Sequence, residues 1–333
     1  MAMKKFINSP DNLTAELLEG YCGAFPDKVT LVSGKIVVRA KPKDQRKVAI
    51  LTLGGAGHEP ALSGFVGEGM LDASVVGDIF AAPGAPKVIE AMRLLKRDAG
   101  ILFVVLNHAG DVMSGNMAME MARKEGIKVK MLLTHEDIAP GANAPAEDRR
   151  GLVGCIPLYK VAGAAAEAGK TLDEVYAVAE KFNNRMATLA VALKPATHPQ
   201  SGQEIFTLAD DEMEIGMGQH GEAGTGRSKR LSADETAVKM LTQLLLAVKA
   251  AKGDKLLVII NGAGATTQME MFIIFRRVRK SIEENGMTVA HARVGEYLTV
   301  QEMGGFQMFI AKLDDELIRL LNAPADAPFW TVR

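Results

Sequence analysis

The amino-acid sequence predicts an α/β protein with two α/β domains, each holding a mainly parallel or mixed sheet flanked by helices. The chain has 333 residues, enough for two domains with sizeable cores. Apolar runs such as Val48 to Leu53 and Gly100 to Leu106 are typical of buried parallel strands. Segments with helical patterns alternate with these runs, and this alternation is characteristic of α/β folds.

The first predicted domain covers residues 1–185. Leu13, Leu17 and Tyr21 recur every fourth residue, which predicts a helix over 13–22. Two short strand-like pieces lie between residues 29 and 38. The remaining expected elements are strands over 48–53, 73–76, 100–106 and 129–133, and helices over 86–97, 113–125, 163–169 and 172–182.

The second predicted domain covers residues 186–333, with the boundary near residue 185. A new apolar run begins at Met186, and a turn-rich stretch follows from Pro195. The expected elements are helices over 233–251, 268–285 and 314–321, and strands over 256–260, 287–292 and 305–311.

Composition excludes several classes of function. Lys plus Arg number 39 and Asp plus Glu 40, so the formal net charge is -1, whereas nucleic-acid-binding proteins usually carry a basic excess. The two cysteines, Cys22 and Cys155, match no zinc motif and are typical of a reducing compartment. Neither a signal peptide nor a long apolar run is present. We expect a cytoplasmic, globular protein that binds no nucleic acid, membrane or metal.

Two of the six histidines stand in near-matching glycine-rich segments, Gly54 to Pro60 and Gly216 to Glu222. Glycines let the backbone turn sharply and approach a ligand closely. His58 and His220 are therefore candidates for contact with a ligand. From the residues alone, His220 can be a base, a metal ligand, a nucleophile or a structural side chain.

His58 and Asp111 each follow the end of a predicted strand. Ligands in parallel α/β sheets bind beyond the carboxyl ends of the strands, so we expect both side chains in one crevice. Asp111 is either a general base or the cap of the following helix. The Gly54 loop matches the dinucleotide fingerprint only loosely, and a phosphate-binding loop is missing, which disfavours an NAD-dependent oxidoreductase.

Four motifs occur in a specific order: Gly54-Gly-Ala-Gly-His-Glu-Pro60, Gly110-Asp-Val-Met113, Arg149-Arg-Gly-Leu152 and Asp210 to Glu222. The opening Phe6 to Asp11 and the later Lys312 to Leu317 fit the same pattern. Together they span essentially the whole chain, and the chain resembles the dihydroxyacetone kinase K subunit family.

The resemblance implies two α/β domains, a homodimer and a short-chain ketose as substrate. It implies that His220 bonds covalently to the ketone carbon as a hemiaminal and that Asp111 takes the proton of the hydroxyl to be phosphorylated. His58 is implied to hydrogen-bond the substrate, which the backbone of Gly55, Ala56 and Gly57 helps to hold.

The chain departs from the family pattern in two motifs near the implied substrate. Leu106 stands where the family commonly has lysine, His108 where it has tyrosine, and Ala82 where it has serine. One corner of the site is thus made apolar, while His108 adds a polar group. We hypothesise that the substrate is a four- or five-carbon ketose such as an erythrulose rather than dihydroxyacetone.

The family's nucleotide-binding L domain is not expected within these 333 residues. We therefore expect no cofactor in this chain and ATP or ADP with magnesium on a separate L-type subunit. The ultimate donor is ATP or a phosphotransferase relay protein, and the sequence leaves both open. The alternative function is a non-catalytic ketose-binding coactivator or sensor of the same fold. Asp111 favours the kinase, since a pure binder needs no base.

Overall fold

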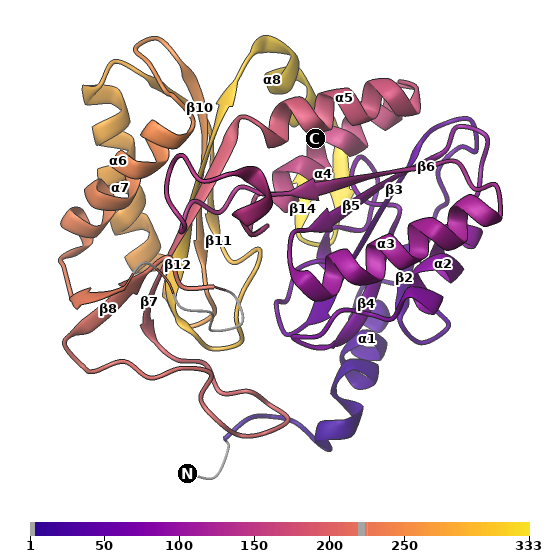
Figure 1. Cartoon of the computed structure of the whole chain (residues 1–333), viewed down its shortest axis with the longest axis horizontal. Helices are drawn as coiled ribbons and strands as arrows, with labels where there is room; N and C mark the ends of the chain where they lie inside the picture. The colour runs from indigo at the N-terminus through magenta and orange to yellow at the C-terminus, as the bar shows by residue number, and fades with distance from the viewer. Residues whose placement is uncertain (1–3, 219–223, 225) are drawn as a thin grey trace. The chain divides into compact units, whose positions relative to one another are not determined.

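The computed structural model describes residues 4–218, 224 and 226–333 (Figure 1). The chain divides into two compact units, which we call the N-terminal and C-terminal units. The N-terminal unit comprises Lys4–Thr134, Cys155–Phe182 and Arg319–Arg333, and the C-terminal unit comprises His135–Gly154 and Asn183–Ile318.

The two units are not separated by a single boundary near residue 185, because each unit is built from separate stretches of the chain. The chain does pass between units at Asn183, close to the expected position. It also passes between them after Thr134, Gly154 and Ile318, so residues 135–154 and 319–333 lie in the unit opposite to the expected one. Local periodicity carries no signal for this, because the sheet that a returning segment joins is decided by contacts distant in sequence.

The N-terminal unit is built on a six-stranded sheet with the order β1-β2-β4-β3-β5-β6. Strands β4, β3, β5 and β6 are parallel, and the hairpin β1-β2 adds an antiparallel edge. The strands are β1 (Val29–Val32), β2 (Ile36–Arg39), β3 (Ala49–Ala56), β4 (Ala73–Ile79), β5 (Ile101–Leu106) and β6 (Val129–Thr134).

Helices cover both faces of this sheet, which explains why β5 is buried along its whole length. On one face, α2 and α3 pack over Leu51, Leu53 and Phe103. On the other face, α1 and α4 contact the strands. The unit's helices are α1 (Leu13–Ala24), α2 (Ala85–Leu94), α3 (Ala109–Lys124), α4 (Cys155–Glu167) and α5 (Leu172–Asn183), and its small hairpin is β13 (Ala325–Ala327) with β14 (Trp330–Val332).

The sheet of the C-terminal unit has the order β11-β10-β12-β7-β8-β9. Only β10 and β11 are parallel, so this sheet is mixed and largely antiparallel. Its strands are β7 (Met186–Lys194), β8 (Glu212–Ile215), β9 (Arg227–Lys229), β10 (Lys255–Gly262), β11 (Thr288–Gly295) and β12 (Gly304–Leu313).

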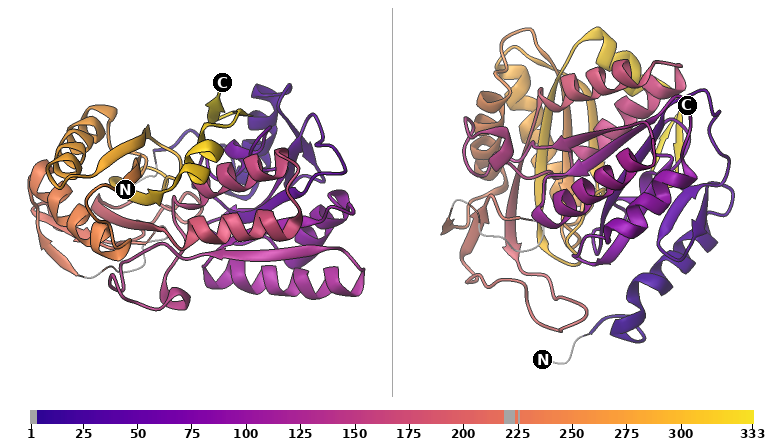
Figure 2. Two further views of the ribbon diagram at one scale, coloured as in Figure 1. Left: turned by 90° about the horizontal axis from the view of Figure 1, so that it is seen from above. Right: turned by 45° about the vertical axis from the view of Figure 1, so that its right-hand side comes forward.

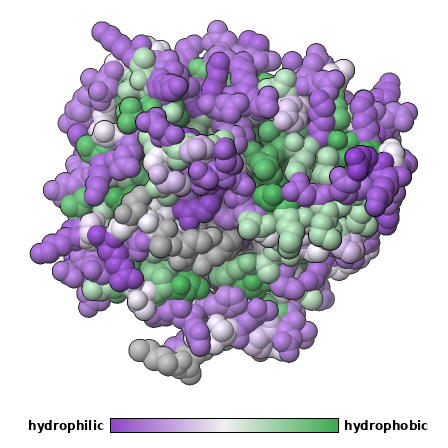
Figure 3. Space-filling model, viewed as in Figure 1, coloured by the Kyte–Doolittle hydropathy of each residue, from purple (hydrophilic) through white to green (hydrophobic). Residues whose placement is uncertain are grey.

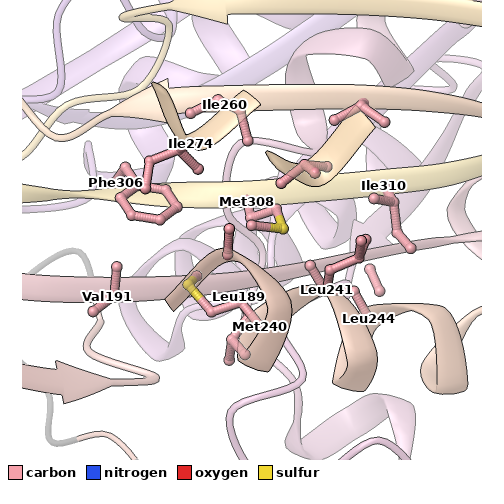
Figure 4. Close-up of a cluster of buried hydrophobic side chains, with 14 of the residues drawn as sticks. Leu189, Val191, Met240, Leu241, Leu244, Ile260, Ile274, Phe306, Met308 and Ile310 are labelled. Carbon is pink, nitrogen blue, oxygen red and sulfur yellow. The ribbon is translucent and has the colours of Figure 1, made fainter. Parts of the chain in front are cut away.

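Helices α6 (Ala233–Ala247) and α7 (Gln268–Glu284) lie side by side on one face of this sheet (Figure 2). Alternate residues of β12, Phe306, Met308 and Ile310, point toward them and form the core drawn in Figure 4. Each helix begins with a capping box, Ser232 with Glu235 for α6 and Thr267 with Glu270 for α7. Helix α8 (Asp315–Asn322) follows β12.

Polar residues dominate the face shown in Figure 3, with smaller apolar patches among them. Over the residues that the structure describes, no helix combines the length and the apolar character that a membrane crossing requires. The fold class agrees with the sequence-based prediction of α/β units with parallel and mixed sheets.

Candidate functional site

The glycine-rich loop that carries His58 continues directly from β3. Gly57 adopts a φ of +102°, a conformation that favours glycine. The His58 side chain is only 5% exposed, and its ring lies against Phe80, with 5.0 Å between ring centroids. His58 is therefore held in place by packing at the carboxyl end of a parallel strand.

The loop after β4 lies against the His58 loop. A Cβ at Gly55 would lie 2.7 Å from the backbone nitrogen of Ala81, and one at Gly57 would lie 2.8 Å from the Phe80 ring. The Phe80 nitrogen also donates a hydrogen bond of 2.8 Å to the Ala56 carbonyl. The glycines of the sequence motif thus permit close contact between two loops, in addition to any contact with a ligand.

Asp111 lies in the first turn of α3, just beyond the carboxyl end of β5, and its side chain is 8% exposed. His108 occupies the N-cap position, so Asp111 is not the cap residue that one interpretation of the sequence suggested. The Ser114 hydroxyl donates 2.6 Å to the Pro83 carbonyl, and a Cβ at Gly110 would lie 3.4 Å from the Ala82 methyl.

Three loops therefore meet at one edge of the sheet, following the adjacent parallel strands β4, β3 and β5. They bring together the regions of Ala82, His58 and Asp111. This edge is the one at which parallel α/β sheets bind ligands. Both His58 and Asp111 follow neighbouring strand ends, as the sequence predicted, and the shared crevice expected there stays a prediction.

Leu106 and His108 precede Asp111 between the end of β5 and the start of α3. Leu106 is the last residue of β5 and is 3% exposed, while His108 is half-buried. The His108 nitrogen donates 2.8 Å to the Leu106 carbonyl, which makes a tight turn before α3. An aliphatic side chain thus occupies the position at the strand end where the family commonly has lysine.

Glu59 follows His58 directly, and its carboxylate accepts a hydrogen bond of 2.9 Å from the Gly57 nitrogen. Burial raises the pKa of Glu59, although hydrogen bonds from the backbone oppose the shift. This carboxylate helps to fix the conformation of the loop that presents His58.

Sequence reasoning missed Tyr159 on α4, which is fully buried. Its hydroxyl lies 2.9 Å from the Thr52 hydroxyl of β3, and Thr52 donates to the Val104 carbonyl of β5. Burial raises the pKa of Tyr159 well above its ordinary value, and the charges of Cys155 and Asp111 act in the same direction. A tyrosine inside an apolar helical run gives no signal in sequence, because its partners come from other elements.

His220, the candidate for the covalent anchor, lies outside the described residues, as do the rest of 219–223 and residue 225.

A cavity of about 340 Å³ borders the N-terminal unit's sheet at Gly54 and Gly55. Its walls are α1, the loop from Glu59 to Gly64, and Phe329. Leu106, His108 and Asp111 do not line it, so we do not assign the ketose to it. Among the described side chains, no cluster of three His, Cys, Asp or Glu residues could hold a metal ion.

Comparison with known proteins identifies the class that this fold and this site define. The Dak1 domain model matches residues 19–329, and the chain belongs to the Dak1 family.

Among curated relatives, the chain is similar to the dihydroxyacetone-binding subunit DhaK of PTS-dependent dihydroxyacetone kinase 1 from Listeria innocua. The two are 38% identical over 98% of this chain and 100% of the relative. It is also 36% identical to L-erythrulose kinase from Pectobacterium atrosepticum, over 98% of this chain but only 56% of that longer protein.

Two solved structures share the fold over almost the whole chain. The dihydroxyacetone kinase operon co-activator Dha-DhaQ superposes with a TM-score of 0.90 at 31% identity, covering 96% of this chain and 98% of that one. The dihydroxyacetone kinase of C. freundii in complex with AMP-PNP and Mg²⁺ gives a TM-score of 0.88 at 29% identity, covering 99% of this chain and 61% of that one.

Proposed function

We propose that this chain is the ketose-binding, catalytic subunit of a dihydroxyacetone-type kinase. The observation that carries the proposal is Asp111, a carboxylate retained in the first turn of α3 where three loops meet beyond adjacent parallel strands. A buried carboxylate at this edge is suited to accept the proton of a substrate hydroxyl as phosphate is transferred. The match to DhaK over the full length of both proteins supports the same role.

In this proposal His220 anchors the substrate. A ring nitrogen of neutral imidazole adds to the ketone carbon, the C=O π bond breaks, and the oxygen takes up the proton that the ring loses. The product is a hemiaminal, which selects ketones over polyols that lack a carbonyl. His58 hydrogen-bonds the bound substrate, and Asp111 faces the hydroxyl that becomes phosphorylated.

The phosphoryl donor is proposed to come from an L-type partner that carries ATP or ADP with magnesium. Two similar proteins extend well beyond the part that this chain matches, and one of them was solved with AMP-PNP and Mg²⁺. We also propose a homodimer, in keeping with the family resemblance. Sedimentation of the purified chain tests the dimer, and assays with and without an L-type subunit test the partner.

We propose a four- or five-carbon ketose, such as an erythrulose, as the preferred substrate, because Leu106 and Ala82 replace polar residues of the family pattern. The named activity of the L-erythrulose kinase relative is consistent with this choice. Phosphorylation rates on dihydroxyacetone and on both erythruloses, measured with an L-type subunit, test it. A clear preference for dihydroxyacetone would contradict the substrate assignment while leaving the kinase assignment intact.

A ketose-binding coactivator is the second candidate. The superposition with Dha-DhaQ favours it, as do the altered Leu106 and Ala82 positions. The same assay separates the two functions, since a coactivator binds ketose without turnover. His220→Ala should abolish the covalent adduct in both cases. Electron density from crystals soaked with ketose shows whether the adduct is present.

A further inference from the structure

Strands β8 and β9 form a hairpin, and the segment that joins them carries His220. The pairing of the two strands ends with Glu214 opposite Arg227. Along the chain His220 stands four residues from Gly216 and four from Gly224. Both of these glycines belong to the described residues, and their contacts define the two ends of the segment.

The two ends lie in direct backbone contact. A Cβ at Gly224 would lie 2.3 Å from the Ile215 carbonyl oxygen and 2.7 Å from the Gly216 carbonyl carbon. Only glycine fits at such a distance. Gly216 has a φ of +85°, and its nitrogen donates 2.7 Å to the Ala190 carbonyl of β7. The entry and exit of the segment are therefore closed against each other.

A buried ion pair holds the entry. The Arg150 guanidinium donates 2.8 Å to the Gly216 carbonyl and 2.7 Å to an Asp137 carboxylate oxygen. Asp137 is fully buried, and its other oxygen accepts a hydrogen bond of 3.0 Å from the Ala139 nitrogen. The carboxylate fixes the guanidinium, and the guanidinium in turn fixes the Gly216 carbonyl.

A second buried carboxylate holds the exit. One Glu214 oxygen accepts a hydrogen bond of 2.7 Å from the Gly224 nitrogen, and the other lies 3.7 Å from Nε of Arg227. Glu214 is only 5% exposed, so water competes little for this bond. Hydrogen bonds to a charged acceptor are also stronger than those between neutral groups.

We propose that Arg150, held by Asp137, and Glu214 are positioning residues. They fix Gly216 and Gly224, between which the chain carries His220, and thereby lower the entropy cost of forming the ketose adduct on His220. The inference rests on the proposed anchoring role of His220. A glycine-rich segment with loose ends samples many conformations. The adduct forms only when the ring nitrogen is aligned with the ketone carbon, so a segment with loose ends loses more conformational entropy on binding than one whose ends are already fixed. Arg150 and Glu214 thus affect ketose binding only through His220.

The test measures the dissociation constants of dihydroxyacetone and L-erythrulose for the full chain by calorimetry. We expect Arg150→Ala and Glu214→Ala each to raise these dissociation constants by at least about tenfold, because each variant leaves further backbone to be ordered on binding. Glu214→Gln keeps an oxygen for the Gly224 nitrogen and should stay within about threefold of the unmodified chain. The matched control is Glu212→Ala in the same strand. Its carboxylate also faces Arg227, at 4.0 Å, but accepts from the Ala209 nitrogen and not from that of Gly224, so the variant should change binding by less than about twofold.

A double-mutant cycle separates positioning from general damage to the fold. In a His220→Ala background, adding Arg150→Ala or Glu214→Ala should weaken ketose binding no further, since their effect passes through His220. Further weakening in that background would overturn the inference. The inference would also be overturned if both single variants bound ketose normally while His220→Ala bound it poorly. That result would leave the proposed function intact. If His220→Ala binds ketose as well as the unmodified chain, the proposed anchor itself fails, and the positioning inference falls with it.

Discussion

At the scale of single residues, the site is defined by what each side chain is packed against. The sequence identified His58 and Asp111 as candidates, but the Phe80 ring against His58 and the Ser114–Pro83 hydrogen bond appear only in the folded chain. The same holds for Tyr159, whose partners Thr52 and Val104 come from two different strands. Local motifs thus identify reactive groups and leave out the residues that hold them.

Asp111→Ala should lower kcat by at least about a hundredfold while leaving ketose affinity within a few fold, because a general base acts only in the transfer step. Steady-state kinetics with an L-type subunit and direct ketose binding measure the two quantities. Glu120→Gln, an exposed change on the same helix, serves as the control. Equal losses in turnover and affinity would argue against the role of base.

Glu136 makes stability depend on pH. Its carboxylate is fully buried, accepts hydrogen bonds from the nitrogens of Leu152 and Gly154, and has its pKa raised by burial from 4.5 to about 7. Between these two pH values the folded chain keeps a proton that the unfolded chain loses. The contribution of Glu136 to the free energy of unfolding should therefore fall as pH rises from about 4.5 to about 7.

Glu136→Gln removes this titration and keeps an oxygen acceptor. The difference in unfolding free energy between the variant and the unmodified chain should thus grow in the variant's favour across that pH range. Urea unfolding at a series of pH values measures it. A difference that stays constant with pH would show that Glu136 does not titrate as assigned.

At the scale of elements, the sequence was most informative for continuous apolar runs. The run Val48 to Leu53 became the core of β3, and Gly100 to Leu106 contains β5. Element ends were harder to predict, since the helix expected over 86–97 ends at Leu94 and the strand expected over 73–76 extends to Ile79. Ends depend on capping and on contacts with neighbouring loops, which hydrophobic periodicity does not encode.

The capping box of α6 gives a prediction at this scale. Ser232→Ala removes the side-chain acceptor for the Glu235 nitrogen and should lower the free energy of unfolding by about 1 kcal/mol. Thr242→Ala, an exposed change inside the same helix, should be neutral or slightly stabilising because alanine has the higher helix propensity. Parallel denaturant titrations compare them, and equal effects would rule out a specific capping contribution.

At the scale of the whole molecule, buried charges join segments that are distant in sequence. Asp72 accepts hydrogen bonds from Lys43 at 2.7 Å, from the Ile50 nitrogen at 2.7 Å and from Arg39 at 3.2 Å. Arg39 also donates 2.9 Å to Glu167, on the segment that returns to the N-terminal unit. The network therefore links the sheet of this unit to its returning helix.

Asp72→Ala leaves buried cations without their central carboxylate and should cost about 3–5 kcal/mol of unfolding free energy. Asp78→Ala is the matched control, because Asp78 pairs with Lys35 at 2.7 Å but its side chain is 61% exposed. The exposed pair should contribute at most about 1 kcal/mol. If the denaturant midpoints of both variants shift equally, Asp72 does not make the larger contribution to the free energy of unfolding that we expect.

The sequence by itself determined the α/β class, the strands that end in glycine-rich loops, and the candidates His58, Asp111 and His220, because these depend on local composition and spacing. Only the tertiary structure decided which segments return to which unit, and that the loop after β4 packs against the loops that carry His58 and Asp111. It also decided that Arg150 and Glu214 hold Gly216 and Gly224, on either side of His220 in the chain. Those features rest on contacts between residues far apart in sequence. Such contacts form when buried polar groups find hydrogen-bonding partners in the folded chain.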